Sequence, residues 1–477
     1  MLFNSLHFLV FFPIVVLCYL IIPRKLRCVW LLAASYYFYM SWNPTYAVLI
    51  AFSTVSTFLT GIFLGKAKGK KEKNLCLTIS FAINLGILFF FKYFDFALEN
   101  VNRILTMLHK SSLEKSFDVL LPVGISFYTF QALGYTVDVY REDIQAEKNL
   151  IRYGLFVSFF PQLVAGPIER SENLLRQIQE ADKQMLWNTD RIRDGLLLML
   201  WGFFQKLMIA DRAAIAVNAV YNQYQVFGGG EIVLATVLFA FQIYCDFDAY
   251  TNIARGAARV CGFELMANFR QPYFALNIAD FWRRWHISLS SWFRDYLYIP
   301  LGGSRVSKVR NWMNLMITFL VSGAWHGASW HFIVWGGIHG AYQIAGKWKS
   351  ALLKKELPKV IQMAVTFVLV CFAWMVFRAN SLGDVKHMII LIMTKPFFKD
   401  LPAMNMSGVE WILLVLSLLV LFAVNLLQEK QISVRELVVK RYFPVRIALY
   451  VLGIGSILVF GVYGVAYDAS QFLYFQF

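Results

Sequence analysis

Long apolar runs constrain this chain more than any other feature of its sequence, because a helix that crosses a bilayer needs about 20 mostly apolar residues. We predict eleven membrane spans, in residues 6–22, 29–42, 45–64, 75–94, 195–215, 232–247, 313–325, 330–346, 360–377, 409–427 and 447–466. Two more apolar stretches, 119–137 and 151–168, are interrupted by Pro, Gly and Gln. We expect these two to be broken, re-entrant or packed inside the protein, because interrupted backbone is tolerated at membrane depth only where it is covered.

The composition excludes two other classes of protein. Hydrophobic residues make up 58% of the chain and charged residues 16%, whereas a soluble domain is about 45–50% apolar and about 25% charged. An aromatic content of 17% is the opposite of a disordered composition. The sequence therefore predicts an all-α, polytopic integral membrane protein of about eleven transmembrane helices, with further re-entrant or interfacial helices.

A formal net charge of +16 on 477 residues first suggests a nucleic-acid partner. Such a partner needs the charge on one wetted face. Here apolar runs separate the basic clusters, which lie at 24–27, 66–73, 305–310, 347–359 and 430–446. Pairs of predicted spans separate most of these clusters, so we place them on one side of the membrane. The positive-inside rule makes that side the cytoplasm and places the N-terminus outside.

The predicted topology does not alternate simply along the whole chain. Three predicted crossings separate Lys73 from the charged loop 170–193, so one of the interrupted stretches is expected not to cross. The C-terminus then lies outside and ends in an aromatic run at 472–477. The run that begins at His7 has no basic segment before it and no small-residue cleavage site after it, which favours a retained first span over a signal peptide.

One candidate for chemistry is His286, in the polar and aromatic stretch from Asp280 to Asp295. Treated as one continuous helix, this stretch places His286 in an aromatic stripe with Trp282 and Trp285. Arginine and serine side chains occupy the other face. Two interpretations stay open: an interfacial helix anchored by Trp and Arg, or a functional histidine.

A second candidate is His326, in a nearly uncharged apolar run between Gly323 and Gly327. The two glycines allow another backbone or an extended substrate chain to approach closely. Burial favours the neutral form of histidine, which can accept a proton from a hydroxyl group. The alternative is a histidine that forms a hydrogen bond between packed helices. His339 is a similar but weaker candidate.

The sequence gives little support for a metal centre or a serine hydrolase. His326 and His331 are five residues apart, which is about 140° around a helix, and no HExxH motif is present. The six cysteines form no CxxC pair, so we predict neither a zinc site nor a disulfide framework. The sequence also lacks the GxSxG motif of α/β-hydrolases. We predict no metal.

Two further polar stretches have open interpretations. Arg305 follows a Gly-Gly-Ser segment too short for a phosphate loop, and its basic neighbourhood either holds an anionic headgroup or nucleotide phosphates or is a positive-inside loop. Asp246 and Asp248 end an apolar span, with Arg255 and Arg259 after them. For these carboxylates we expect ion pairing with arginine rather than acid–base catalysis.

Taken together, these residues resemble the membrane-bound O-acyltransferase (MBOAT) superfamily, and specifically its bacterial branch of alginate O-acetylation membrane proteins. The resemblance rests on PVGISFYTFQALGYTVDVYR (122–141), FFPQLVAGPIER (159–170), NIADFWRRWHISLSSWFRDYLYIPLGG (277–303), SGAWHGASWHFIVWGGIHG (322–340) and FLYFQF (472–477). The family's essential histidine corresponds to His326, and its second, more variable polar residue to His286. The chain departs from the family's DFSGYTDIA-like string at Asp248 and Asn252, so we assign no role to that string.

The resemblance implies one membrane domain over 1–477, with peripheral spans in 1–115, a catalytic core in 116–350 and C-terminal spans in 351–477, around a central funnel. It implies a multi-pass protein of the bacterial cell membrane that moves an acetyl group from a cytoplasmic thioester, such as acetyl-CoA, for O-acetylation of an exported or cell-surface polysaccharide. No cofactor is expected to be permanently bound, and a separate exported or membrane-anchored acetyltransferase is the expected partner.

Within that framework, His326 is the expected catalytic base and His286 positions the donor or the acceptor. Trp325 shapes the tunnel, and Arg305 attracts the anionic donor. Three alternatives remain. One is transfer of D-alanyl or another acyl group to a cell-wall polymer. The others are non-enzymatic: a transporter, or a scaffold of a polysaccharide export complex.

Overall fold

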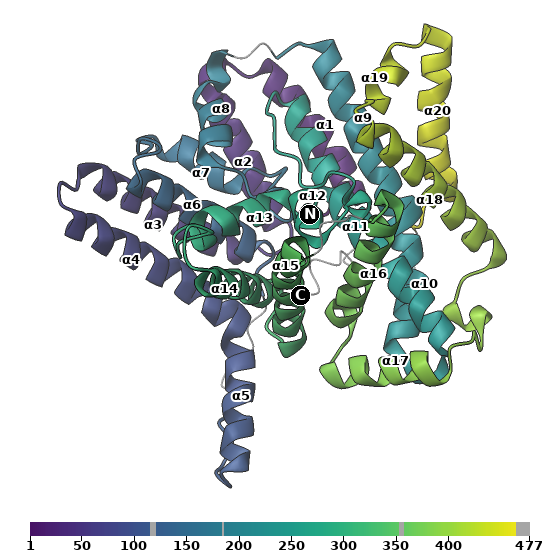
Figure 1. Ribbon diagram of the computed structural model, residues 1–477. Helices are drawn as coiled ribbons and strands as arrows, with labels where there is room; N and C mark the ends of the chain where they lie inside the picture. Colours follow the sequence, from purple (N-terminus) through teal and green to yellow (C-terminus); the bar gives the residue numbers. More distant parts are fainter. Residues whose placement is uncertain (115–120, 184–185, 353–356, 464–477) are drawn as a thin grey trace. The chain divides into compact units, whose positions relative to one another are not determined.

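The computed structural model describes residues 1–114, 121–183, 186–352 and 357–463, and every regular element in these ranges is helical (Figure 1). The prediction of an all-α protein is therefore confirmed for the described residues. The aromatic run 472–477 and the last residues of the predicted span 447–466 lie outside them.

The chain forms two compact units. The first contains residues 1–192, 257–266 and 327–329, and the second contains residues 193–256, 267–326 and 330–477. The division into a core at 116–350 between peripheral and C-terminal spans stays a prediction.

The described residues of the first unit include eight complete α-helices. Its helices are α1 (Leu6–Ile21), α2 (Arg27–Met40), α3 (Tyr46–Lys66), α4 (Lys70–Leu88), α5 (Phe94–Met107), α6 (Ile125–Tyr140), α7 (Leu150–Ser158) and α8 (Arg176–Gln179). Helices α3 and α4 pack against α6, while α2 packs against α7. Every residue of α6 from Ile125 to Val139 is buried. This confirms that the interrupted stretch at 119–137 is packed inside the protein over its described helix.

Helix α4 continues through a π-helical segment, Phe89–Tyr93, into α5. Together they form a continuous helical segment of 38 residues, Lys70–Met107. At 1.5 Å per residue this corresponds to about 57 Å, against about 30 Å for the hydrocarbon core of a bilayer. The span predicted at 75–94 is therefore part of a longer helix, and none of the residues of α5 is buried.

The second unit contains all or most of each remaining α-helix in the described residues. They are α9 (Thr189–Phe204), α10 (Asp211–Asn222), α11 (Gly229–Val260), α12 (Ile278–Arg284), α13 (Ile287–Phe293), α14 (Lys308–His326), α15 (Trp330–Leu352), α16 (Lys359–Arg378), α17 (Leu382–Thr394), α18 (Gly408–Glu429), α19 (Val434–Val439) and α20 (Phe443–Phe460). A π-helical segment, η5 (Gln205–Ala210), joins α9 to α10. Helices α14 and α15 pack closely against each other, and α12 and α16 pack against α15.

Within the described part of the chain, six helices are long and apolar enough to cross a membrane. They are Tyr46–Lys66, Lys70–Met107, Gly229–Val260, Lys359–Arg378, Gly408–Glu429 and Phe443–Phe460. A shorter apolar helix, Leu6–Ile21, accompanies them. A multi-pass membrane protein is confirmed, but the count of eleven spans is not. One reason is length, since α2 has only 14 residues.

A candidate active site in the second unit

His286 lies at a break between two short helices and not within one continuous helix. Helix α12 ends at Arg284 and α13 begins at Ile287. Between them His286 has φ 43° and ψ 54°, in the left-handed region that non-glycine residues rarely adopt. The expectation of a single helix from Asp280 to Asp295 is therefore wrong, because the backbone reverses its handedness at the histidine.

The side chain of His286 is enclosed by aromatic rings. It is 1% exposed, its ring centroid lies 4.6 Å from that of Phe247 on α11, and it lies 6.1 Å from that of Trp325 on α14. Burial lowers the pKa of His286 to about 3, because the charged form loses its hydration. His286 is therefore neutral at physiological pH.

His326 is the last residue of α14, and it is also buried. Its ring centroid lies 5.1 Å from that of the adjacent Trp325 and 5.0 Å from that of Trp335 on α15. The ring of Phe377 on α16 lies 5.5 Å away. The structure therefore brings three predicted site residues together, since the Trp325 ring neighbours both histidines.

Two glycines hold α14 and α15 at the short distance that this arrangement requires. A Cβ atom added to Gly323 would collide with the main-chain oxygen of Phe332, and one added to Gly336 would collide with that of Phe319. The prediction that Gly323 permits close approach of a backbone is confirmed, and the backbone that approaches it is that of α15.

His339 also lies in this region, with its side chain fully buried. Its Nδ1 accepts a hydrogen bond of 3.2 Å from Nε1 of Trp282. Its ring stacks on Phe281 at 6.3 Å, with 6° between the ring planes. These contacts tie α12 to α15 next to Trp335, so His339 has the packing role that the sequence allowed for it.

The described residues contain no group of three or more His, Cys, Asp or Glu side chains that could hold a metal ion. His331 lies in the first turn of α15, whereas His326 ends α14. The argument from 140° of rotation around one helix therefore does not apply, because the chain turns between the two histidines.

A buried charge cluster lies elsewhere in the second unit. Nζ of Lys206, on η5, lies 2.6 Å from Oδ1 of Asp246 on α11 and 2.8 Å from Oδ1 of Asp211. Next to it, Nε2 of Gln205 donates to Oδ2 of Asp248 at 2.8 Å. The partner that the structure shows for Asp246 is Lys206, whereas the sequence predicted an arginine. Pairing of either aspartate with Arg255 or Arg259 stays a prediction.

The sequence contains a signal for this cluster, although no motif marks it. Lys206 and Asp211 are two opposite charges inside the apolar run 195–215. Charges at membrane depth are costly and rare. A charged side chain inside an apolar run therefore predicts an oppositely charged partner, but the sequence does not show which residue that partner is.

Arg305 is exposed on the turn that precedes α14. Gly302 and Gly303, with φ of 109° and 56°, form this turn. Nδ2 of Asn311 donates to the main-chain oxygen of Gly303 at 2.9 Å, and Nδ2 of Asn314 donates to the same oxygen at 3.2 Å. The structure therefore fixes the loop backbone and leaves the Arg305 side chain exposed, unlike the buried His286, Trp325 and His326.

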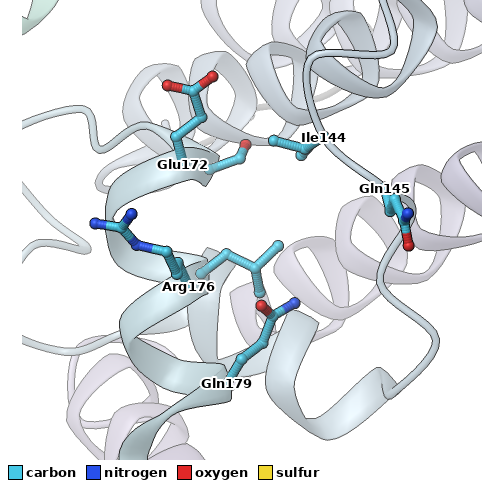
Figure 2. A pocket seen from close by; sticks show the side chains of 7 residues that line it. Ile144, Gln145, Glu172, Arg176 and Gln179 are labelled. Atoms are coloured by element: carbon cyan, nitrogen blue, oxygen red, sulfur yellow. The ribbon is translucent and has the colours of Figure 1, made fainter.

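The first unit contains a separate pocket of about 420 Å³, lined by Ile144, Gln145, Ser171, Glu172, Leu175, Arg176 and Gln179 (Figure 2). Nε2 of Gln179 donates to Oε2 of Glu147 at 2.6 Å. Five of the seven lining residues are polar or charged, and Figure 2 shows the guanidinium of Arg176 directed away from the open space. None of the predicted site residues lines it.

Comparison with known proteins assigns the chain to one family of membrane enzymes. The family model of the membrane-bound O-acyltransferases (MBOAT) matches residues 31–383. The chain is 38% identical over 387 residues to the probable alginate O-acetylase AlgI of Pseudomonas syringae pv. tomato, covering 80% of this chain and 73% of that protein. It is 35% identical over 415 residues to the peptidoglycan O-acetyltransferase of Helicobacter pylori, covering 80% and 78%. It is also 27% identical over 282 residues to the teichoic acid D-alanyltransferase of Bacillus subtilis, covering 54% and 69%.

The family match covers most of the chain, and both histidines of the buried site fall inside it. The similar proteins act on different polymers and carry different acyl groups by name, but each of them transfers an acyl group. The chain belongs to the membrane-bound O-acyltransferase family and is a multi-pass membrane O-acyltransferase.

Proposed function

We propose that this enzyme moves an acetyl group from a cytoplasmic thioester, such as acetyl-CoA, across the cell membrane for O-acetylation of an exported or cell-surface polysaccharide. The observation that carries the proposal is the placement of His286 and His326 around the ring of Trp325, in a buried aromatic enclosure. Support for acetyl as the transferred group comes from similar proteins named as alginate and peptidoglycan O-acetylating enzymes.

In the proposed reaction, His326 is the general base. Its imidazole accepts the proton of an acceptor hydroxyl as the hydroxyl oxygen attacks the acetyl carbonyl. The C–S bond of the thioester then breaks, and the proton passes from the imidazolium to the leaving thiolate. General base catalysis contributes about 10²–10⁴-fold in rate. Exclusion of water by the surrounding rings protects the thioester from hydrolysis.

The other site residues have supporting roles in this proposal. His286 is neutral at physiological pH because of its burial, so it orients the donor or the acceptor by hydrogen bonding rather than by charge. Trp325 forms the wall between the two histidines. Arg305, exposed on its turn, attracts the anionic donor at the cytoplasmic face.

The reaction takes place in one membrane domain of defined orientation, which passes the acetyl group to a partner. Residues 1–477 form one domain with its core at 116–350, the N-terminus lies outside, and a separate exported or membrane-anchored acetyltransferase receives the acetyl group. Two expectations have physical support. The positive-inside rule supports the orientation, and the need for an acyl group made in the cytosol to reach an external polymer supports a transmembrane route.

The test is the acetyl content of the secreted or cell-surface polymer, measured by mass spectrometry in cells that carry His326→Ala at the wild-type protein level. We expect acetylation to be lost. The control is His109→Asn, at an exposed position with a φ of 53° that asparagine tolerates, and it should acetylate normally. Wild-type acetylation in the His326→Ala strain would remove His326 from the mechanism, and loss of D-alanyl rather than acetyl groups would identify a different acyl group.

A further inference from the structure

The backbone conformation of His286 requires support from outside its own segment. A histidine at φ 43° is uncommon, and such conformations persist only where surrounding contacts hold them. The two residues that follow it are the first of α13, and the first N–H groups of a helix have no partner within that helix. Their hydrogen bonds therefore show what holds the turn.

Both of those N–H groups donate to one residue, Asn268. The N–H of Ile287 donates to the main-chain oxygen of Asn268 at 2.9 Å. The N–H of Ser288 donates to its side-chain Oδ1 at 3.1 Å. Because one residue accepts both bonds, it fixes the direction in which the chain leaves His286 as well as its position.

The same loop also holds the chain on the other side of the histidine. The N–H of Arg270 donates to the main-chain oxygen of Arg284 at 2.9 Å. The loop therefore makes hydrogen bonds on both sides of the His286 turn. Arg270 bonds to the chain before the turn, and Asn268 accepts two bonds from the chain after it. Asn268 lies 18 residues before His286 in the chain, so this support is tertiary and not local.

Asn268 is in turn fixed to α11, the helix that packs against the His286 ring. Its side chain is fully buried, and its Nδ2 donates to Oγ1 of Thr251 at 3.3 Å. Thr251 lies one helical turn after Phe247, whose ring lies 4.6 Å from that of His286. Helix α11 therefore contacts the imidazole directly through Phe247 and supports its backbone through Thr251 and Asn268.

We propose that Asn268 is a positioning residue for acyl transfer, which acts by holding His286 in its left-handed conformation so that the imidazole faces Trp325. This inference rests on the proposed function, because it requires that the placement of His286 matters for transfer. Asn268 does not contact His326 or Trp325 in any of the interactions described above, so its effect is exerted through the His286 backbone.

The test compares Asn268→Ala with Asn268→Asp, both at the wild-type amount of folded protein in detergent. Asp keeps an acceptor for the Ser288 N–H, and the Thr251 hydroxyl can donate to its second oxygen, whereas Ala removes both bonds. We expect Asn268→Ala to lower polymer acetylation at least tenfold and Asn268→Asp to keep at least half of it. A role in packing alone gives the opposite order, because a carboxylate is costlier than a methyl group in a buried site.

Hydrogen–deuterium exchange supplies a second readout that is independent of activity. Asn268→Ala should raise exchange of the peptide that contains Ile287 and Ser288, and Thr251→Val should do so to a smaller extent and remain useful if the alanine variant does not fold. The matched control is Asn277→Ala, which removes another asparagine side chain that accepts a backbone N–H, at the start of α12, and it should acetylate normally.

Unchanged exchange at Ile287 and Ser288, or an alanine variant as active as the aspartate variant, would overturn the inference. Failure of the proposed function gives a different pattern. In that case His286→Gly, which tolerates the left-handed conformation without support, acetylates at the wild-type level, although Asn268→Ala still raises exchange.

Discussion

Lys206 and Asp246 form a buried ion pair that joins η5 to α11, with 2.6 Å between Nζ and Oδ1. The side chains are 1% and 5% exposed, and Asp211 shares the same ammonium group. Replacing the lysine leaves two carboxylates buried without their cation. We therefore expect Lys206→Met to destabilise the protein by about 3–5 kcal/mol, the usual effect of breaking a buried pair from one side, measured as a lower midpoint of thermal unfolding in detergent.

The control for this prediction is Lys73→Met. Lys73 also forms an ion pair, with Glu142 at 2.5 Å, but the glutamate is 75% exposed. An exposed pair of this kind contributes little to stability, because water screens its two charges. Combining Lys206→Met with Asp211→Asn and Asp246→Asn should restore part of the lost stability, because no uncompensated charge remains. Equal effects of Lys206→Met and Lys73→Met would contradict the structural role of the cluster.

The Lys206–Asp246 pair illustrates which features of this protein follow from its sequence and which depend on the tertiary structure. The periodicity and length of the apolar runs predicted the helical fold and the membrane class. They did not predict the partner of Lys206, because Asp246 lies 40 residues away and the pairing depends on how two helices pack. The break at His286 was missed for a similar reason, since the pattern from Asp280 to Asp295 fits a helix and the hydrogen bonds that hold the break are accepted by Asn268, which lies outside that stretch.

The close packing of α14 and α15 gives a second prediction. A methyl group at Gly323 would collide with the main-chain oxygen of Phe332, and backbone atoms cannot move aside as a flexible side chain can. We expect Gly323→Ala to cost about 1–3 kcal/mol, as overpacking does, and to lower acetylation because it displaces the end of α14 that carries His326. Thermal unfolding and polymer acetylation measure the two effects.

Gly337→Ala is the matched control for that substitution. It lies on the same pair of helices, but an added Cβ would meet its nearest neighbour, Cδ2 of Leu320, at an ordinary 3.6 Å. Alanine is also the better helix former, by about 1 kcal/mol. Gly337→Ala should therefore be neutral or stabilising. If Gly323→Ala is equally well tolerated, then the two helices are not held together by backbone contact at this position.

The buried imidazole of His286 predicts a dependence of stability on pH. Its pKa is lowered to about 3 in the folded protein, against about 6.5 in an unfolded chain. Between these values the unfolded state binds more protons, so the free energy of unfolding rises with pH through this window and the contribution is complete above about pH 6.5. We expect stability to fall as the pH is lowered from 6.5 towards 4, by up to about 1.4 kcal/mol per pH unit from this group.

His286→Asn isolates the contribution of this histidine, because asparagine tolerates the left-handed conformation and does not titrate. The measurement is the midpoint of thermal unfolding at pH 7.5 and pH 5.0 for both proteins. The difference between the two midpoints should be smaller for the variant. An identical pH dependence would show that His286 is solvated or charged in the folded protein.

The long helix from Lys70 to Met107 sharpens the test of orientation. Its 38 residues exceed the thickness of a bilayer, so its two ends are expected on opposite sides of the membrane. Lys68 lies just before this helix and His109 just after it, and both are exposed.

In intact cells, a membrane-impermeant maleimide should label His109→Cys and leave Lys68→Cys unlabelled until the membrane is opened, since basic loops stay in the cytoplasm. The wild-type protein, with its six cysteines, provides the background. Labelling of Lys68→Cys alone would invert the topology, and labelling of both positions from outside would mean that this helix does not cross the membrane.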